Sequence, residues 1–376
     1  MEPVRVGVVG TGNISGIYLE NSHKFREYEV VAVADILQDR AQEQATKYDI
    51  PRALSVDELI ADPDVELVLN LTIPTAHAGI AIRSLEAGKV AYGEKPFATN
   101  REDGQRILDA AATAGRAVGC APDTFLGAGA QTIRQAIDAG RIGTPHSAYC
   151  GFASPGPAIW HPDPYFFFQP GGGPVLDMGP YYITALVALL GPIRRVTAKG
   201  FAPSKERVIG RGPKAGQTIP VEVMTTVTAQ IELESGVVAT MFVSWDVWDT
   251  QNAKFEVYGA DGAISGWDPN TFGGPIRLSN AEIIQRGNGW GGWEDLPLVS
   301  PHDSNSRGLG LADIAVAHRT GAAPRASGTL AFHVLDVLLA ILESAEQDQP
   351  VEIASRAERP AALPESLAAW TVTLDR

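Results

Sequence analysis

The chain has 376 residues, of which 45% are apolar and 20% charged, and its formal net charge is −14. This length exceeds one ordinary hydrophobic core and predicts two domains in a globular protein. The negative charge argues against nucleic acid or an anionic membrane surface as a partner. No apolar run approaches the ~18 residues of a membrane span, and the first residues do not resemble a signal peptide. We therefore expect a cytoplasmic protein.

Residues 1–122 alternate between β-rich runs and helix-like segments. The β-rich runs are Val4–Val9, Val30–Ala34, Val65–Leu71, Lys89–Tyr92 and Ala117–Ala121. The helix-like segments are Ile14–Phe25, Gln38–Tyr48, Thr75–Ala87 and Arg101–Ala114, with a short extra helix at Asp57–Ala61. Regular alternation implies right-handed crossovers and a parallel sheet. We expect a doubly wound α/β domain of the Rossmann type over residues 1–122.

Residues 123–376 follow a different pattern. Helical segments are predicted at Ala128–Ala139, Asp177–Leu190, Leu309–Thr320 and Thr329–Gln347. Alternating runs at Val223–Leu233, Val237–Trp245 and Lys254–Tyr258 are separated by turn residues and predict antiparallel strands. The Gly-rich stretch 202–220 reads as an exposed loop. We expect an α+β domain with a large, mostly antiparallel open sheet over residues 123–376.

The glycine loop after the first strand predicts a dinucleotide site. Gly10 and Gly12 directly follow the strand and open a helix through Asn13 and Ile14. Glycine there permits a tight turn and close approach of a pyrophosphate to the helix N-terminus. The third glycine of the usual pattern is replaced by Ser15, and a turn that needs glycine for its own geometry is the alternative.

Three further positions would border this cofactor. Asp35 ends the second strand, where a carboxylate accepts hydrogen bonds from ribose hydroxyls and repels a 2′-phosphate. We therefore expect NAD rather than NADP, although Arg40 lies close in sequence, and a helix cap is the other reading of Asp35. Thr72 and Pro74 follow the third strand and could line the same pocket, or form an ordinary loop with Thr75 as helix cap. His77 is expected to be structural.

The sequence Glu94-Lys95-Pro96 ends the fourth strand on the same edge of the sheet. Proline restricts Lys95 to an extended backbone, which fixes where its side chain starts. An ammonium beside a nicotinamide can polarise a carbonyl, stabilise an alkoxide or relay a proton. Glu94 could orient that lysine or contact the cofactor ribose. A surface salt bridge between the two neighbours is the alternative.

The Gly-x-Gly turn is followed in order by "TIPTAH", "EKP", "GGGPVLDMGPYY" and the C-terminal "RGLGLADIAVAH" and "SGTLAFHVLDVLLAILESAE". This order of segments resembles the Gfo/Idh/MocA family of oxidoreductases. It implies that Lys95 is catalytic and that the Asp-x-x-x-His pair of the family falls on Asp177 and Tyr181. Tyrosine thus replaces histidine, and a lysine ammonium nearby would favour its phenolate. Tyr181 could instead only pack and bind substrate, and Asp177 could merely cap its helix.

Several other residues are candidates for contact with substrate. Asp123 and Thr124 follow the fifth strand, although a turn aspartate is the alternative for Asp123. His161, Asp163 and Tyr165 lie in an aromatic-rich loop whose rings suit the apolar faces of a sugar, or simply belong to the core. Tyr182 adjoins Tyr181. No cluster of histidine, cysteine and carboxylates predicts a metal.

The resemblance implies an NAD-dependent oxidoreductase that moves hydride between nicotinamide and a carbinol carbon of a sugar, cyclitol or sugar derivative. It also implies a homodimer or homotetramer formed through the C-terminal sheet. Two alternatives stay open. One is a glycosidase or eliminase that oxidises a sugar transiently with tightly held NAD, and the other is a non-catalytic NAD-binding sensor.

Overall fold

The chain forms two compact units in the computed structural model, which describes residues 2–287 and 291–373. Unit 1 comprises the residues up to Gln131, Val299–Leu335 and those from Pro360 onward, and unit 2 comprises Thr132–Leu298 and Asp336–Arg359. The expected first domain ended at residue 122. The structure adds to it two later segments of the chain, because a helix from 309 onward packs on its sheet.

Unit 1 is built on a six-stranded parallel sheet. Its strands are β1 (Val4–Val9), β2 (Tyr28–Ala34), β3 (Ala53–Leu54), β4 (Leu67–Asn70), β5 (Val90–Gly93) and β6 (Val118–Cys120). Their order is β3-β2-β1-β4-β5-β6, and every pairing is parallel. The strands consist mainly of apolar residues, as expected for a sheet with helices on both faces. The prediction of a doubly wound parallel sheet is therefore confirmed.

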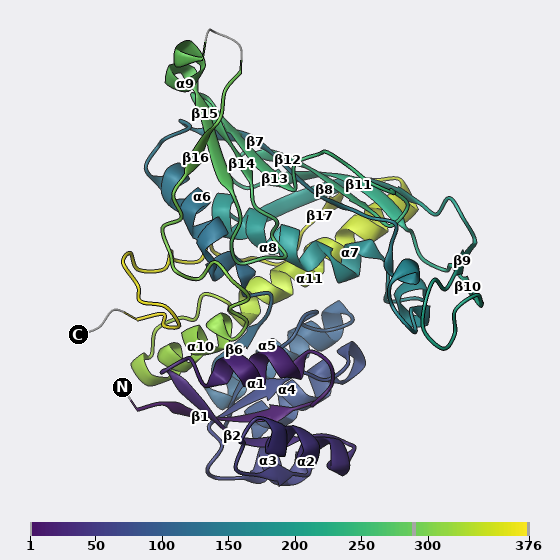
Figure 1. Ribbon diagram of the computed structural model, residues 1–376, viewed down its shortest axis with the longest axis vertical. Coiled ribbons are helices and arrows are strands. Elements are labelled where there is room, and N and C mark those ends of the chain that lie inside the picture. The colour runs from purple at the N-terminus through teal and green to yellow at the C-terminus, as the bar shows by residue number, and fades with distance from the viewer. Residues whose placement is uncertain (1, 288–290, 374–376) are drawn as a thin grey trace. The chain divides into compact units, whose positions relative to one another are not determined.

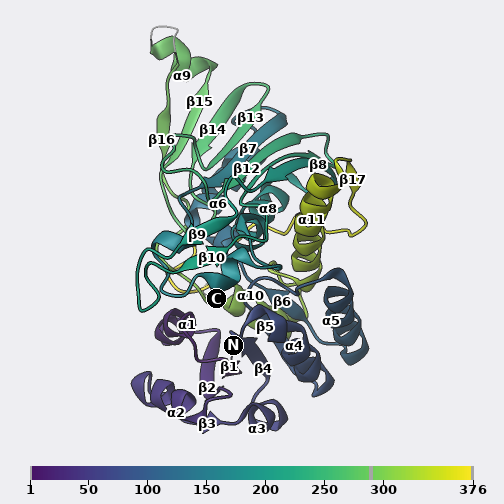
Figure 2. The ribbon, with the colours of Figure 1, turned by 90° about the vertical axis from the view of Figure 1, so that its right-hand side faces the viewer.

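Helices line both faces of this sheet (Figure 2). They are α1 (Ser15–Ser22), α2 (Gln38–Lys47), α3 (Val56–Ala61), α4 (His77–Glu86), α5 (Arg101–Ala114) and α10 (Leu309–Thr320). Leu59 of α3 and Ile80 of α4 share one apolar cluster with β1 and β4. The Asn100 side chain accepts the Asp103 N–H and caps α5 as predicted. Thr75 does not cap α4, which begins after Ala76 because a 3-10 turn (Pro74–Ala76) precedes it.

Unit 2 is built on a nine-stranded sheet of order β16-β15-β14-β13-β7-β12-β11-β8-β17. The strands are β7 (Pro145–Ala153), β8 (Ile193–Phe201), β11 (Thr226–Leu233), β12 (Val238–Ser244), β13 (Phe255–Gly259), β14 (Gly262–Gly266), β15 (Ile276–Asn280), β16 (Glu294–Leu296) and β17 (Val351–Glu352). Only the β7–β12 pairing is parallel among these described strands. The prediction of a large, mostly antiparallel sheet is confirmed.

The helices of unit 2 lie against one face of its sheet (Figure 1). They are α6 (Ala128–Asp138), α7 (Pro174–Asp177), α8 (Gly179–Leu190) and the second half of α11 (Gly328–Gln347), while α9 (Ala281–Arg286) extends from the end of β15. Gly179 approaches Leu338 so closely that a Cβ there would lie 2.4 Å from its side chain. On the opposite face the strands present alternating exposed residues, such as Thr228 and Gln230. This face of the sheet is open, as the alternation predicts.

A small lobe departs from the sequence expectation. The stretch 202–220 was expected to be a loop, yet it contains the paired strands β9 (Glu206–Val208) and β10 (Thr218–Pro220). Ile209 and Ile219 are buried in one apolar cluster with Phe168 and Trp245. Two apolar residues thus order a stretch that its charge and glycine content made look exposed.

Helix α11 is long and apolar enough to span a membrane by length and composition alone. Its most apolar 18-residue window has a mean hydropathy of 1.6, and 61% of that window is buried within the protein. A mostly buried helix of this kind also matches the core helix of a globular protein.

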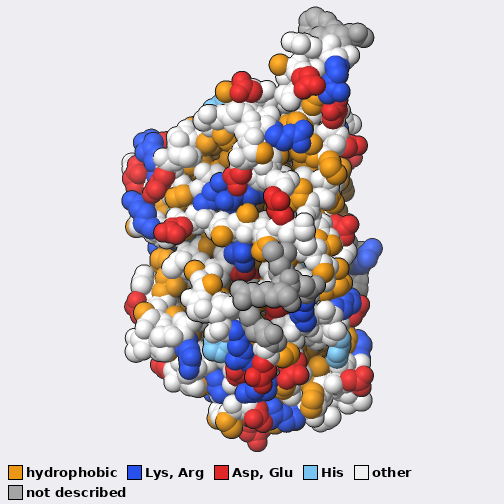
Figure 3. All heavy atoms as spheres, turned by 90° about the vertical axis from the view of Figure 1, so that its left-hand side faces the viewer, with side chains coloured by type: hydrophobic (Ala, Val, Ile, Leu, Met, Phe, Trp, Pro, Cys, Tyr) orange, Lys and Arg blue, Asp and Glu red, His pale blue; other side chains and the backbone are white. Residues whose placement is uncertain are grey.

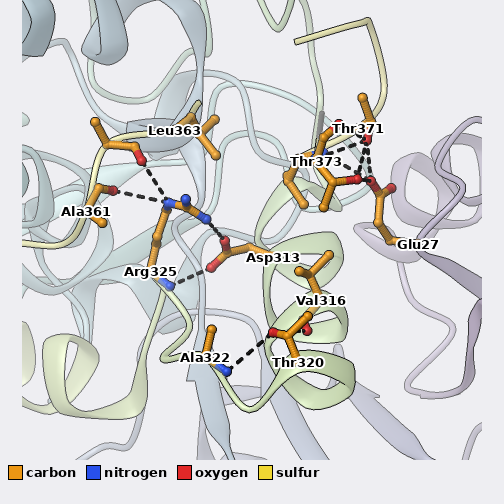
Figure 4. A network of polar contacts seen from close by, with 12 residues as sticks. Glu27, Asp313, Val316, Thr320, Ala322, Arg325, Ala361, Leu363, Thr371 and Thr373 are labelled. Atoms are coloured by element: carbon orange, nitrogen blue, oxygen red, sulfur yellow. Dashed lines mark hydrogen bonds and ion pairs between the residues drawn. The ribbon is translucent and has the colours of Figure 1, made fainter. Parts of the chain in front are cut away.

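The C-terminal segment returns to unit 1 and is held there by polar contacts (Figure 4). The Arg325 guanidinium bonds the buried Asp313 carboxylate and the carbonyl of Ala361. The Thr371 hydroxyl donates to the carboxylate of Glu27, which also accepts the N–H of Val372 at 3.1 Å. The last described residues therefore belong structurally to the first unit.

Candidate functional site

The glycine loop joins β1 to α1 at the carboxyl edge of the unit 1 sheet. Gly10 has φ +96°, and a Cβ there would lie 2.7 Å from the Leu71 carbonyl carbon, so glycine is required for close approach to β4. A Cβ on Gly12 would meet nothing within 4 Å, which leaves space beside the backbone. Ser15, where a third glycine was expected, is buried and its hydroxyl donates to the Gly12 carbonyl at 2.7 Å. The loop thus keeps its turn without that glycine.

Asp35 lies immediately after β2 with its carboxylate oriented by the protein. Its Oδ2 accepts the backbone N–H of Thr11 at 2.8 Å and the Thr11 hydroxyl at 3.0 Å, and its Oδ1 accepts the N–H of Leu37 at 3.0 Å. Arg40 approaches Oδ2 to 3.8 Å. Burial alone raises the pKa of Asp35, but these donors and the Arg40 charge outweigh burial and hold it below its usual range. Asp35 is therefore a carboxylate at neutral pH.

Two exposed apolar side chains flank this loop. Ile36 follows Asp35 and is 91% exposed, and Ile73 follows β4 and is 69% exposed. Because β2 and β4 are the neighbours of β1 in the sheet, both side chains lie at the strand ends next to the glycine loop. The loop, the carboxylate and these apolar surfaces fit the pyrophosphate, ribose and base of a dinucleotide.

The segment after β4 is tied to the segment after β5 through His77. One ring nitrogen of His77 lies 2.7 Å from the Pro96 carbonyl oxygen, and the other lies 3.1 Å from that of Thr72. The Thr72 hydroxyl donates to Asn70 at 2.6 Å. His77 is 3% exposed, which agrees with the structural role expected for it. Pro74 is the first residue of the 3-10 turn (Pro74–Ala76), which lies between Thr72 and His77 in the chain.

Glu94 and Lys95 directly follow β5, at the same edge as the glycine loop. Both residues are half-buried. The Glu94 carboxylate accepts the Tyr18 hydroxyl at 2.7 Å and the Lys95 N–H at 3.1 Å. The backbone N–H of Glu94 donates to the Asn70 carbonyl at 2.9 Å. The lysine backbone is therefore fixed from β4, from β5 and from α1.

Asp123 has a different environment from the one that a substrate contact requires. It is 1% exposed, and its Oδ2 accepts the backbone N–H groups of Gly308 and Gly310 at 3.1 and 3.0 Å. Burial raises the pKa of Asp123 to about 6 despite those donors. This placement favours a role at the start of α10 over contact with a sugar. Thr124 is 2% exposed, so its side chain is likewise enclosed.

In unit 2, Asp177 and Tyr181 lie on successive helices. Asp177 is the last residue of α7, and Tyr181 lies in the first turn of α8 after a break at Met178. The continuous helix expected over Asp177–Leu190 is therefore wrong, as is the reading of Asp177 as its cap. Pro180 lacks the N–H that a continuous helix needs, and it occupies the first turn of α8. Tyr181 is 9% exposed and Asp177 is half-buried.

The remaining candidates in unit 2 are the buried Tyr182 and three residues of the aromatic loop, which are His161, Asp163 and Tyr165. Tyr182 is fully buried and donates to Asp268 at 3.0 Å, so it is enclosed within unit 2 and does not present its hydroxyl to a ligand. The His161 ring packs edge-on against Phe166 and Phe167. Tyr165 is 50% exposed, and Asp163 pairs with Lys214 at 2.6 Å. The aromatic loop is thus part core and part surface.

Within residues 2–287 and 291–373, no three histidine, cysteine or carboxylate side chains are grouped so that they could hold a metal ion. On the face that Figure 3 shows, blue lysine and arginine side chains are interspersed with red carboxylates. That face therefore carries no continuous basic track among its described residues.

Sequence reasoning did not identify Thr11 and Tyr18, which position Asp35 and Glu94. Thr11 lies between the two glycines of the loop. A hydroxyl at that position is only a weak indication in the sequence that it contacts Asp35 at the end of the second strand. Tyr18 lies 76 positions before its partner. A contact of that separation leaves no periodic pattern in one sequence, so only the fold reveals it.

Comparison with known proteins assigns two long segments of the chain to one family. Residues 4–121 match the model described as an oxidoreductase family with an NAD-binding Rossmann fold, and residues 130–265 match the GFO/IDH/MocA C-terminal domain. A 1,5-anhydro-D-fructose reductase of Ensifer adhaerens is 27% identical over 93% of this chain and 98% of its own length. An inositol 2-dehydrogenase of Agrobacterium fabrum is 37% identical, over 40% of this chain and 46% of its own.

Solved structures share the whole fold. The apo form of levoglucosan dehydrogenase aligns with a TM-score of 0.82 over 95% of this chain and all of its own, at 21% identity. The NAD-binding assignment of residues 4–121 confirms the cofactor expected from Gly10, Gly12 and Asp35. The two family matches together span more than half of the sequence, and the chain belongs to the Gfo/Idh/MocA family of NAD-binding oxidoreductases.

Proposed function

We propose that the protein is an NAD-dependent dehydrogenase or reductase of a sugar, cyclitol or sugar derivative. The observation that carries this proposal is the position of Lys95. It follows β5 at the strand edge that also carries the glycine loop, and the Tyr18–Glu94 hydrogen bond and the His77 bridge tie its segment to that edge. The names of relatives, an anhydrofructose reductase and inositol 2-dehydrogenases, support a polyhydroxylated substrate.

The bound nicotinamide would supply a hydride acceptor or donor. Gly10, Gly12, Asn13 and Ile14 would hold the pyrophosphate, Asp35 would bind the ribose hydroxyls, and Thr72, Pro74 and Glu94 would border the rest of the cofactor. In the oxidative direction the carbinol carbon loses hydride, and its hydroxyl proton must pass to a base. We assign that proton to Lys95, because an amine can take it while the resulting ammonium stabilises the nascent carbonyl.

Tyr181 is proposed to share this proton work, and Asp177 to position the substrate. A phenol with a pKa near 10 is a poor base alone, but a nearby ammonium favours the phenolate. His161, Asp163 and Tyr165 remain candidates for contact with sugar hydroxyls and ring faces. The homodimer or homotetramer through the open sheet and the cytoplasmic location stay predictions.

Turnover of a polyol panel tests the proposal. Polyols, aldoses and inositols would be incubated with NAD or NADP, and absorbance of the reduced nicotinamide would be followed. We expect NAD-dependent oxidation of at least one compound, and Lys95→Met to lower kcat by a factor on the order of 100 or more, as for loss of a general acid or base. Lys47→Met, at an exposed helix position, serves as the control. Product formation without accumulation of free NADH would instead support transient oxidation.

Tyr181→Phe tests the role of the phenol. We expect a lower kcat and a changed dependence of kcat on pH, because the titrating hydroxyl is removed. Tyr182→Phe is the matched control, since that tyrosine is buried and bonded to Asp268. Near-normal turnover and an unchanged pH profile in the Tyr181 variant would leave Lys95 as the only proposed proton carrier.

A further inference from the structure

The carboxylate of Glu94 connects the cofactor-binding helix to the proposed catalytic lysine. Tyr18 lies in α1, the helix that begins after the glycine loop, and is 2% exposed. Its hydroxyl donates to Glu94 Oε1 at 2.7 Å, while Glu94 Oε2 accepts the backbone N–H of Lys95 at 3.1 Å. The orientation of this carboxylate therefore depends on a side chain of the cofactor helix.

The Tyr18 hydroxyl remains a donor under all ordinary conditions. Burial, followed by the charge of Glu94, raises its pKa well above the usual value. The phenol consequently keeps its proton, and hydrogen bonds to an ionised acceptor are among the stronger ones in proteins. The backbone of Glu94 is held separately, through its N–H to Asn70 and through its carbonyl, which accepts the Cys120 thiol. Tyr18 thus acts on the side chain of Glu94 in particular.

Two neighbouring tyrosines provide a natural contrast. Tyr28 and Tyr92 are also almost fully buried in unit 1, at 2% and 1% exposure. Within the described parts of the chain, their hydroxyls have no hydrogen-bond partner. The three tyrosines therefore differ in what the hydroxyl contacts rather than in burial, and only the Tyr18 hydroxyl is bonded to the segment that carries Lys95.

We propose that Tyr18 is a positioning residue for Lys95, acting through Glu94. The inference rests on the proposed function in one respect, which is that Lys95 carries the proton. Tyr18 is not assigned a chemical step. Its hydroxyl fixes the carboxylate that receives the Lys95 N–H, and so fixes the point from which the lysine side chain extends toward its reaction partner.

Tyr18→Phe removes the donor and leaves the ring in place. We expect kcat to fall about tenfold, comparable with the loss of one hydrogen bond to a charged group. The dissociation constant for NADH, measured by its fluorescence on binding, is expected to stay near the wild-type value because the glycine loop and Asp35 are untouched. Tyr28→Phe and Tyr92→Phe are expected to leave kcat unchanged.

Hydrogen exchange gives a readout that does not depend on turnover. The Lys95 amide donates to Glu94, and Pro96 after it has no amide hydrogen, so a peptide over residues 93–97 reports on few positions. We expect faster exchange there in Tyr18→Phe than in the Tyr28 and Tyr92 variants. Equal exchange in all three variants would overturn the inference.

A double-mutant cycle tests whether Tyr18 acts through Glu94, and Lys95→Met separates this inference from the proposed function. If Tyr18 acts through Glu94, adding Tyr18→Phe to Glu94→Ala will lower kcat little further, whereas independent effects would multiply. Normal turnover in Lys95→Met would refute the proposed function, and the positioning role with it. An inactive Lys95→Met beside a Tyr18→Phe variant that matches its controls would refute the positioning role alone.

Discussion

Asp35 is the residue whose local contacts say most about cofactor choice. Its two oxygens are oriented by Thr11 and Leu37, and its lowered pKa keeps it charged at neutral pH. A fixed carboxylate accepts hydrogen bonds from ribose hydroxyls and repels a phosphate at the same place. Arg40 lies 3.8 Å away and partly offsets that repulsion, so we expect the preference for NAD to depend on the charge of Asp35.

Asp35→Asn tests this dependence. Loss of the charge should weaken NAD binding about tenfold, the order of one charged hydrogen bond, and should weaken NADP binding much less because the repulsion is also removed. Titration of both cofactors against the protein measures the two dissociation constants. Asp39→Asn, an exposed carboxylate in the first turn of α2, is the control. An unchanged ratio of the two constants in Asp35→Asn would contradict the assignment.

At the scale of elements, α10 is held on unit 1 by two carboxylates with opposite titration behaviour. The Glu66 carboxylate accepts hydrogen bonds from both terminal nitrogens of Arg319 in α10, at 2.6 and 2.9 Å. It also accepts a hydrogen bond from the backbone N–H of Arg5 in β1. The Arg319 hydrogen bonds lower the pKa of Glu66 to about 2. At the other end of the helix, burial raises the pKa of Asp123 to about 6.

These two values predict different effects of pH on stability. Glu66 has a folded pKa below its ordinary value of 4.5, so it stabilises the fold above that pH, and the contribution is lost as pH falls toward 2. Asp123 has a folded pKa above its ordinary 3.8, so ionising it costs stability as pH rises from about 4 to about 6. Ionisation of Glu66 therefore stabilises the folded protein at neutral pH, whereas ionisation of Asp123 destabilises it.

Denaturant unfolding of Glu66→Gln and Asp123→Asn between pH 3 and 8 distinguishes them. Glu66→Gln should lower the free energy of unfolding at pH 7 by about 2 kcal/mol, and by less near pH 3. Asp123→Asn keeps an acceptor oxygen for the α10 amides and does not ionise, so its free energy of unfolding should gain on that of the wild type as pH rises from about 4 to about 6. Parallel pH curves for wild type and both variants would contradict both assignments.

The elements that sequence patterns predicted best are those whose signals are local. The strand at Val4–Val9 and the helix at Arg101–Ala114 were predicted to the residue, because an apolar run and an Asn100 cap with a terminal glycine mark their ends. The strands β9 and β10 were missed because three residues are too few to show a pattern. The break between α7 and α8 was signalled by Gly179-Pro180 and overlooked.

The same distinction between local signals and contacts with distant segments applies to the candidate site residues. The placement of Lys95, Asp35 and the two glycines at one edge of the sheet could be predicted, because each lies within three residues of the end of a strand and the carboxyl ends of parallel strands meet at one edge. The roles of Tyr18 and Asp123 could not, since each depends on a contact with a distant segment. Asp123 was even assigned to substrate, because nothing local shows that Gly308 and Gly310 enclose it.

At the scale of the whole molecule, unit 1 is assembled from three separate stretches of the chain. The last stretch contributes the buried side chains Leu363, Leu367 and Val372, and the Trp370 ring packs edge-on against Phe25. Glu27 is 4% exposed and accepts hydrogen bonds from Thr371 and Val372. Removing that stretch would therefore expose apolar surface and leave a buried carboxylate without these donors.

Deletion of residues 360–376 should consequently destabilise the cofactor-binding unit. Three buried aliphatic side chains, each worth about 1.5–3 kcal/mol on burial, amount to much of the 5–15 kcal/mol that typically stabilises a folded protein. We expect loss of NAD binding and a markedly lower midpoint of thermal unfolding. Leu363→Ala should show a graded form of this effect, about 2–4 kcal/mol, whereas the same substitution at the exposed Leu298 should be nearly neutral. NAD binding with an unchanged thermal midpoint after the deletion would mean that residues up to 335 hold the dinucleotide fold without the returning segment.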